Sequence, residues 1–116
     1  MNPKARVTRD IADLVAPFLH RRQQDIESLR VALQTEDSIR LRMLGQRMRA
    51  LGEPYGFSHI TTLGRQIAEA SEGAEFDLIR GLIEQYDEYL RSVEIVHIEV
   101  PAPTWQDVPL LLPQLP

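Results

Sequence analysis

The sequence predicts an all-α protein: an antiparallel four-helix bundle, with a helical turn before it and an irregular, proline-rich tail after it. Four segments carry apolar residues at the spacing of one helix face, and short connections with glycine or capping residues separate them. Such helices bury their apolar faces most simply against one another. Five of the eight prolines lie in the last sixteen residues. We therefore expect a helical domain over residues 8–96 and a tail over residues 97–116.

Composition favours one small, soluble and cytoplasmic domain. The chain has 116 residues, of which 43% are hydrophobic and 26% charged, and it contains no cysteine. The net charge of −4 argues against nucleic-acid binding, which depends on clustered basic residues. The first residues lack the apolar run of a signal peptide, and no stretch is long enough to span a membrane. The sequence indicates no cofactor and no metal site.

Residues 1–7 are expected to form an irregular N-terminal segment. Thr8 can cap a short helical turn. Pro17 then ends or kinks this turn, or lies in the first turn of a longer helix. From about Phe18 to Gln34 the apolar residues form one helical stripe, Leu19, Ile26, Leu29 and Leu33.

Three further helices follow. The first is expected over residues 38–51, before a loop that Gly52, Pro54 and Gly56 impose. Ser58 can cap the next helix and Gly73 can end it. The last helix, over residues 75–93, has the clearest apolar stripe. The predicted core of the bundle comprises Leu29, Met48, Leu63, Ile67, Ile79, Ile83 and Tyr86.

The C-terminal segment changes in character. Residues 94–100 are short and β-branched, and regular structure is not expected from Pro101 onward. This tail contains Trp105 and the run Leu110–Leu112. We favour a tail that packs back on the bundle or stays mobile. The alternative is a tail that docks a partner.

The helix over residues 38–51 carries the most informative pattern. Arg42, Gln46 and Arg49 share one helix face. The small residues Gly45 and Ala50 are expected to leave Gln46 approachable. The opposite, core face carries Leu44, Met48 and Leu51.

This segment resembles the histidine phosphotransfer (HPt) domains of bacterial two-component signalling. In that family the second bundle helix presents a histidine after a small residue, with lysine three, glycine four and glycine ten positions later. Gly45, Arg49, Ala50 and Gly56 stand at the corresponding positions, and Gln46 stands at the histidine's position.

The resemblance extends over about residues 10–96 and includes the loop triplet Tyr55, Gly56 and Phe57. It implies a phosphorelay module whose partner is a response-regulator receiver domain or a histidine kinase. Arg42, Gln46, Arg49 and Ala50 are then the partner-binding residues, and the triplet is a structural loop.

Phosphotransfer needs an imidazole nitrogen that attacks an acyl phosphate. The amide of Gln46 has no such nitrogen, so the sequence predicts a non-enzymatic binding module without a catalytic residue. His20, His59 and His97 lack the small-residue setting and the cation three positions later, and we interpret them as solvated or packing residues.

Two alternatives remain open at this point. The chain is an active phosphotransfer protein in which Gln46 is an introduced substitution or another histidine carries the phosphate. Otherwise it is a helical scaffold or homodimerising module whose tail is the contact.

Overall fold

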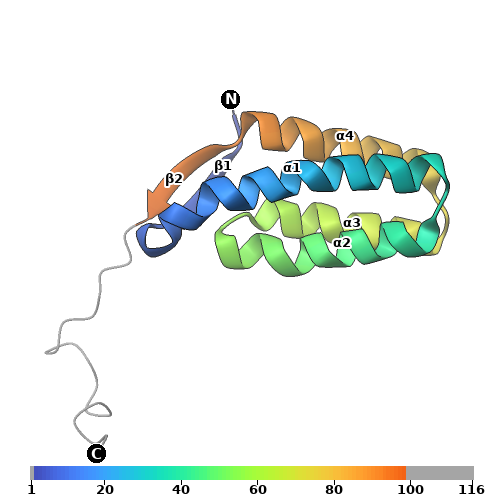
Figure 1. The fold of residues 1–116 in the computed structure, drawn as a ribbon, viewed down its shortest axis with the longest axis horizontal. Coiled ribbons are helices and arrows are strands. Elements are labelled where there is room, and N and C mark those ends of the chain that lie inside the picture. The colour runs from blue at the N-terminus through green and yellow to red at the C-terminus, as the bar shows by residue number, and fades with distance from the viewer. Residues whose placement is uncertain (1, 99–116) are drawn as a thin grey trace, which may run out of the picture.

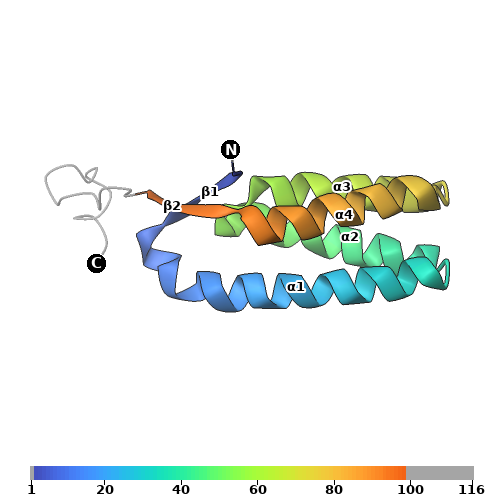
Figure 2. The ribbon, with the colours of Figure 1, turned by 90° about the horizontal axis from the view of Figure 1, so that it is seen from above.

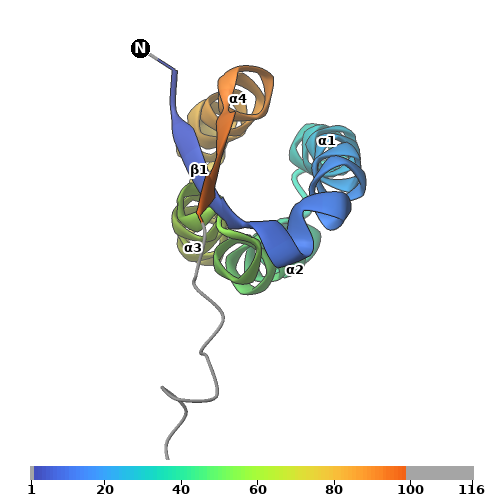
Figure 3. The same ribbon diagram turned by 90° about the vertical axis from the view of Figure 1, so that its left-hand side faces the viewer.

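In the computed structural model, which describes residues 2–98, four antiparallel helices form a bundle with a pair of strands at one end (Figures 1 and 2). The helices are α1 (Ala12–Gln34), α2 (Ser38–Gly52), α3 (Ser58–Glu72) and α4 (Phe76–Ser92). Viewed along the bundle, α1, α2, α3 and α4 follow one another around a ring, so that α4 lies diagonally across from α2 (Figure 3). The prediction of an all-α four-helix bundle is confirmed.

The predicted core residues are buried. Leu29, Met48, Leu63, Ile67, Ile79, Ile83 and Tyr86 each expose 1% or less of their surface. The helix boundaries also agree with the expected ones to within one residue for α2 and α4. Gly73 lies at the C-terminal cap of α3 as expected. Ser58 is instead the first helical residue, and no side chain caps this helix.

The N-terminal prediction was wrong in one respect and right in another. Residues 2–7 are not irregular, because Lys4–Thr8 form strand β1. The predicted helical turn is present as a 3-10 turn, Arg9–Ile11, with Thr8 at its N-cap, although the Thr8 side chain makes no capping hydrogen bond. This turn leads directly into α1, and Pro17 lies inside that helix. Pro17 costs one backbone hydrogen bond, but the residue is exposed, so water can satisfy the carbonyl that is left free.

Strand β1 pairs in parallel with β2 (Glu94–Ile98), in a register that places Ala5 opposite Ile95 and Thr8 opposite Ile98. Ala5 and Val7 point into the core and alternate with exposed residues, as a strand with one buried face requires. The folded unit therefore extends beyond the expected range 8–96 on both sides. The predicted tail from Pro101 onward lies outside the described residues.

Candidate functional site

Helix α2 positions the residues that the sequence singles out. Its N-terminus is capped by Asp37, whose carboxylate accepts a hydrogen bond of 3.0 Å from the backbone N–H of Arg40. The side chains of Leu41, Leu44 and Met48 are buried in the bundle. Burial of this face fixes the rotation of the helix about its axis and turns the opposite side to solvent.

We call this exposed side the outer face of α2. The predicted partner-binding residues all belong to it, and all are exposed. Two apolar residues that the sequence analysis did not select, Ile39 and Met43, lie beside them and are 75% and 61% exposed. Their spacing of four residues could have identified them. The outer face of α2 comprises Ile39, Arg42, Met43, Gln46, Arg49 and Ala50.

The charge of α2 differs from that of the rest of the chain. Residues 38–52 contain four arginines and no acidic residue, in a protein with a net charge of −4. Arg42 makes one exposed ion pair of 3.6 Å with Glu72 of α3, which screening by water leaves weak. The neighbouring helix adds another cation, Arg65, which is exposed and follows Gly64 at the level of Arg49.

Gln46 is exposed, as expected, but Gly45 does not contribute to its exposure, because Gly45 is buried and faces α3. A Cβ at this position would lie 2.7 Å from the carbonyl oxygen of Gly64 and 2.8 Å from the amide nitrogen of Ala68. Gly45 and Gly64 thus let the backbones of two helices pack closely, which holds the outer face of α2 on a rigid support.

Thr61 attaches the C-terminal end of α2 to α3. Its hydroxyl donates a hydrogen bond of 3.0 Å to the carbonyl of Arg49 and accepts one of 2.8 Å from the amide of Glu53. Both backbone groups lie at the end of α2, where the backbone lacks hydrogen-bond partners within the helix. The backbone at Arg49 and Ala50 is therefore fixed by α3.

A buried polar cluster lies behind α2. Asp25 of α1 is 4% exposed, and its Oδ1 accepts a hydrogen bond of 3.0 Å from Nη2 of Arg47. Arg22 is similarly buried, and its Nε lies 2.9 Å from Oδ2 of Asp25. These two groups form an ion pair, but their geometry does not make a hydrogen bond. Arg47, next to Gln46, is thereby tied to α1. Burial raises the pKa of Asp25, and the two arginines offset this only in part.

The hydroxyl of Tyr86, on α4, is buried without a hydrogen-bond partner among residues 2–98. Burial and the nearby carboxylate of Asp25 raise the pKa of this phenol, so it stays neutral. Arg47 is the residue of α2 that contacts Asp25 of this cluster, and Arg47 does not belong to the outer face. We assign it a structural role.

The triplet Tyr55, Gly56 and Phe57 lies in the connection between α2 and α3 and makes contacts within the bundle. Gly56 has a φ of +89°, and a Cβ there would collide with the carbonyl oxygen of Arg6 in β1. Phe57 is fully buried, and the ring centroid of Tyr55 lies 4.3 Å from that of Phe18. This glycine faces the strand, so internal packing accounts for it without any approaching partner.

The histidines do not share the setting of Gln46. His20 is exposed on α1, and His59 is exposed at the start of α3 with its ring 4.8 Å from that of Tyr89. Burial raises the pKa of Tyr89 to about 12, so this neighbour is uncharged at neutral pH. His97 belongs to β2. Within residues 2–98 no group of histidine and acidic side chains could hold a metal ion.

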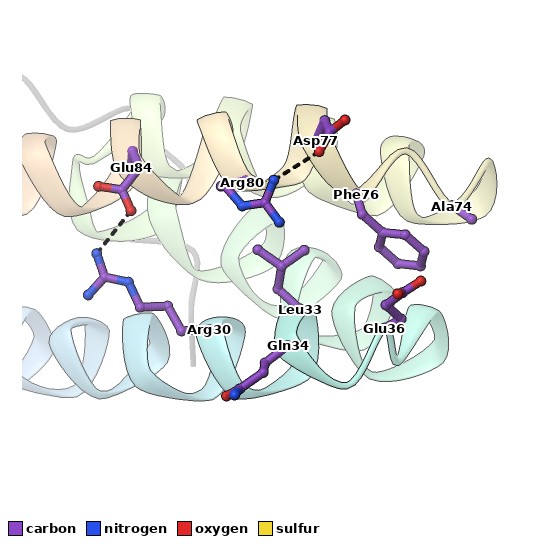
Figure 4. Close-up of a pocket in the computed structure, with 9 residues that line it drawn as sticks. All are labelled: Arg30, Leu33, Gln34, Glu36, Ala74, Phe76, Asp77, Arg80 and Glu84. Atoms are coloured by element: carbon purple, nitrogen blue, oxygen red, sulfur yellow. Dashed lines mark hydrogen bonds and ion pairs between the residues drawn. The ribbon is translucent and has the colours of Figure 1, made fainter.

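A cavity of about 730 Å³ lies between the C-terminal half of α1 and the N-terminal half of α4 (Figure 4). Both of its arginines are paired with acidic residues of the lining: Arg30 contacts Glu84 at 3.2 Å and Arg80 contacts Asp77 at 2.8 Å. The hydrogen bond to Asp87 contributes most to raising the pKa of Arg30, and the hydrogen bond to Glu84 contributes next. With its cations already paired, this cavity is a weaker candidate for an ionic ligand than the outer face of α2.

Comparisons of the chain with protein-family models, with curated protein sequences and with solved structures find no significant match. Among residues 2–98 no helix combines the length and the apolar character that crossing a membrane requires.

Proposed function

We propose that the protein is a binding module of the HPt type, which docks an acidic partner on the outer face of α2 and carries no phosphate. The observation that supports this most is the charge of α2, which has four arginines and no acidic residue in an otherwise acidic protein and places two of them, Arg42 and Arg49, on its outer face. Exposed Ile39 and Met43 beside these arginines supply the apolar contact that a stable interface needs.

The resemblance to HPt domains suggests the class of partner. Receiver domains gather acidic side chains at their phosphorylation site, and the arginines of α2 complement such a site in charge. Gln46 lies between Met43 and Arg49 on the exposed face, where the family has its histidine. Its amide can donate and accept hydrogen bonds but cannot attack a phosphoryl group.

The test is binding to a panel of receiver domains and histidine kinases, measured at low and high salt. We expect salt-sensitive binding of at least one of them, which Arg49→Glu weakens about tenfold, a loss of roughly 1.4 kcal/mol. Stability should hardly change, because glutamate suits an exposed helix position. A phosphorylated receiver should transfer no acid-labile phosphate to the chain.

The matched control is Arg80→Glu, which changes the net charge equally but lies on α4, diagonally across the bundle (Figure 3). Arg65 is unsuitable as a control because it lies at the level of Arg49. If both reversals weakened binding equally, the effect would come from the net charge of the protein and not from the outer face of α2. If no receiver or kinase binds, the scaffold alternative becomes the better description.

A further inference from the structure

We propose that the C-terminal tail of this chain docks on its own bundle, with the indole of Trp105 in a groove between the start of α1 and the end of α2. This contact is separate from the outer face of α2 and does not depend on the proposed function. Trp105 lies outside the described residues, whereas the groove and Ile98, the last described residue, are both placed.

The groove has a volume of about 170 Å³ and is lined by apolar and aromatic side chains with two arginines at its edge. A cavity of about 150 Å³ accommodates a benzene ring, so this groove has room for one aromatic group. Leu14 at its rim is 51% exposed, so an aromatic side chain in the groove would cover its apolar surface. Phe18 and Tyr55, stacked at 4.3 Å, form its floor.

The end of β2 lies within reach of this groove. Ile98 pairs with Thr8, which is followed by the 3-10 turn and then by α1 (Figure 1). Leu14 is only six residues after Thr8, and three residues of 3-10 helix plus three of α-helix advance about 10 Å. Trp105 is seven residues beyond Ile98, a reach of about 23 Å when extended. The tryptophan can therefore reach the groove without any change in the bundle.

Chemistry favours the same occupant. Residues 99–116 contain two acidic residues, Glu99 and Asp107, and no basic one, whereas exposed Arg21 borders the groove; Arg22, its other arginine, is buried and paired with Asp25. The guanidinium of Arg22 already lies 5.0 Å from the ring centre of Phe18, and Arg21 is exposed and able to cover a second aromatic ring. Prolines 101 and 103 favour an extended chain before Trp105, which lowers the entropy lost on docking.

Trp105 is the only tryptophan, so its fluorescence reports directly on the contact. In the full chain, selective excitation of tryptophan should give a blue-shifted emission and weak quenching by acrylamide, both independent of protein concentration. Leu14→Glu should shift the emission to the red and increase quenching several-fold. Val31→Glu is the matched control, because Val31 is 56% exposed on the same helix but far from the groove, and it should change neither quantity.

Circular dichroism of Leu14→Glu establishes that the bundle is folded. The milder Leu14→Ala should give a smaller red shift of the emission and a smaller increase in quenching. Emission of a fully hydrated indole in the parent chain would overturn the proposal. The same holds for equal effects of the substitutions at Leu14 and Val31. A blue shift that grows with protein concentration would assign the groove to a second copy of the chain and also overturn it.

Discussion

The same glycine-to-alanine change is expected to act oppositely at Gly64 and at Gly81. A Cβ at Gly64 would lie 2.5 Å from the amide nitrogen of Arg49 and from the carbonyl oxygen of Gly45, and neither backbone group can move aside. Gly64→Ala should therefore lower the free energy of unfolding by about 1–3 kcal/mol. At Gly81 nothing lies within 4 Å, so Gly81→Ala should raise it by about 0.5–1 kcal/mol.

Urea denaturation of both variants measures these changes. If Gly64→Ala were neutral, the close packing of α2 on α3 would be looser than described, and the glycines of α2 would again be open to a functional explanation.

Arg22 and Asp25 are buried charges, and their removal from water lowers the stability of the folded state. The variant Arg22→Met leaves the Asp25 carboxylate buried with only Arg47 beside it, and at neutral pH this should lower the free energy of unfolding by about 3 kcal/mol. Replacing both residues, as Arg22→Met with Asp25→Leu, should be neutral or stabilising, because it removes the desolvation of both charges.

The pH dependence follows from the raised pKa of Asp25. Because the folded state binds this proton more tightly than the unfolded state, the contribution of Asp25 to stability falls as the pH rises from its ordinary pKa of 3.8 through the raised value. Arg22→Met raises that pKa further, so its cost should shrink in acid, where Asp25 is protonated. Denaturation at pH 4 and pH 7 checks this, and a cost that does not vary with pH would contradict it.

Among the elements, α4 has the most regular apolar stripe, and Ile83 lies near its centre with 1% of its surface exposed. Truncation there removes three carbons from a packed interior and leaves a cavity. Ile83→Ala should lower the free energy of unfolding by about 2–5 kcal/mol. Leu78→Ala on the exposed side of the same helix is the control, since Leu78 is 52% exposed. Similar losses at the two positions would mean that the buried face of α4 is misassigned.

For the whole molecule, the pair β1–β2 joins the two ends of the described chain and closes one end of the bundle (Figure 1). Val7 is fully buried, whereas Arg6 on the other face of the strand is exposed. Val7→Ala should cost about 1.5 kcal/mol, at about 0.8 kcal/mol for each buried carbon lost. Arg6→Ala should cost less than about 0.5 kcal/mol. Thermal unfolding of the two variants distinguishes a packed strand from a loosely attached one.

The sequence by itself determined the four helices, their order and the buried residues of the core. Helical periodicity is local, so the stripe through Ile79, Ile83 and Tyr86 is visible without knowledge of what covers it. It also identified Gln46 and its neighbouring arginines as one exposed face, because burial of Leu44 and Met48 leaves only one direction for the opposite side of the helix.

Only the tertiary structure decided what depends on distant contacts. The five residues of β1 alternate as a strand does, but so short a strand is stable only when it is paired, and its partner lies 90 positions away in the register Lys4–Glu94. Gly45 and Gly56 fit a motif equally well whether they admit a partner or a neighbouring helix and strand. The structure places α3 and β1 against them. The pairing of Asp25 with Arg47 likewise appears only once α1 and α2 are packed, because no local pattern relates residues 22 positions apart.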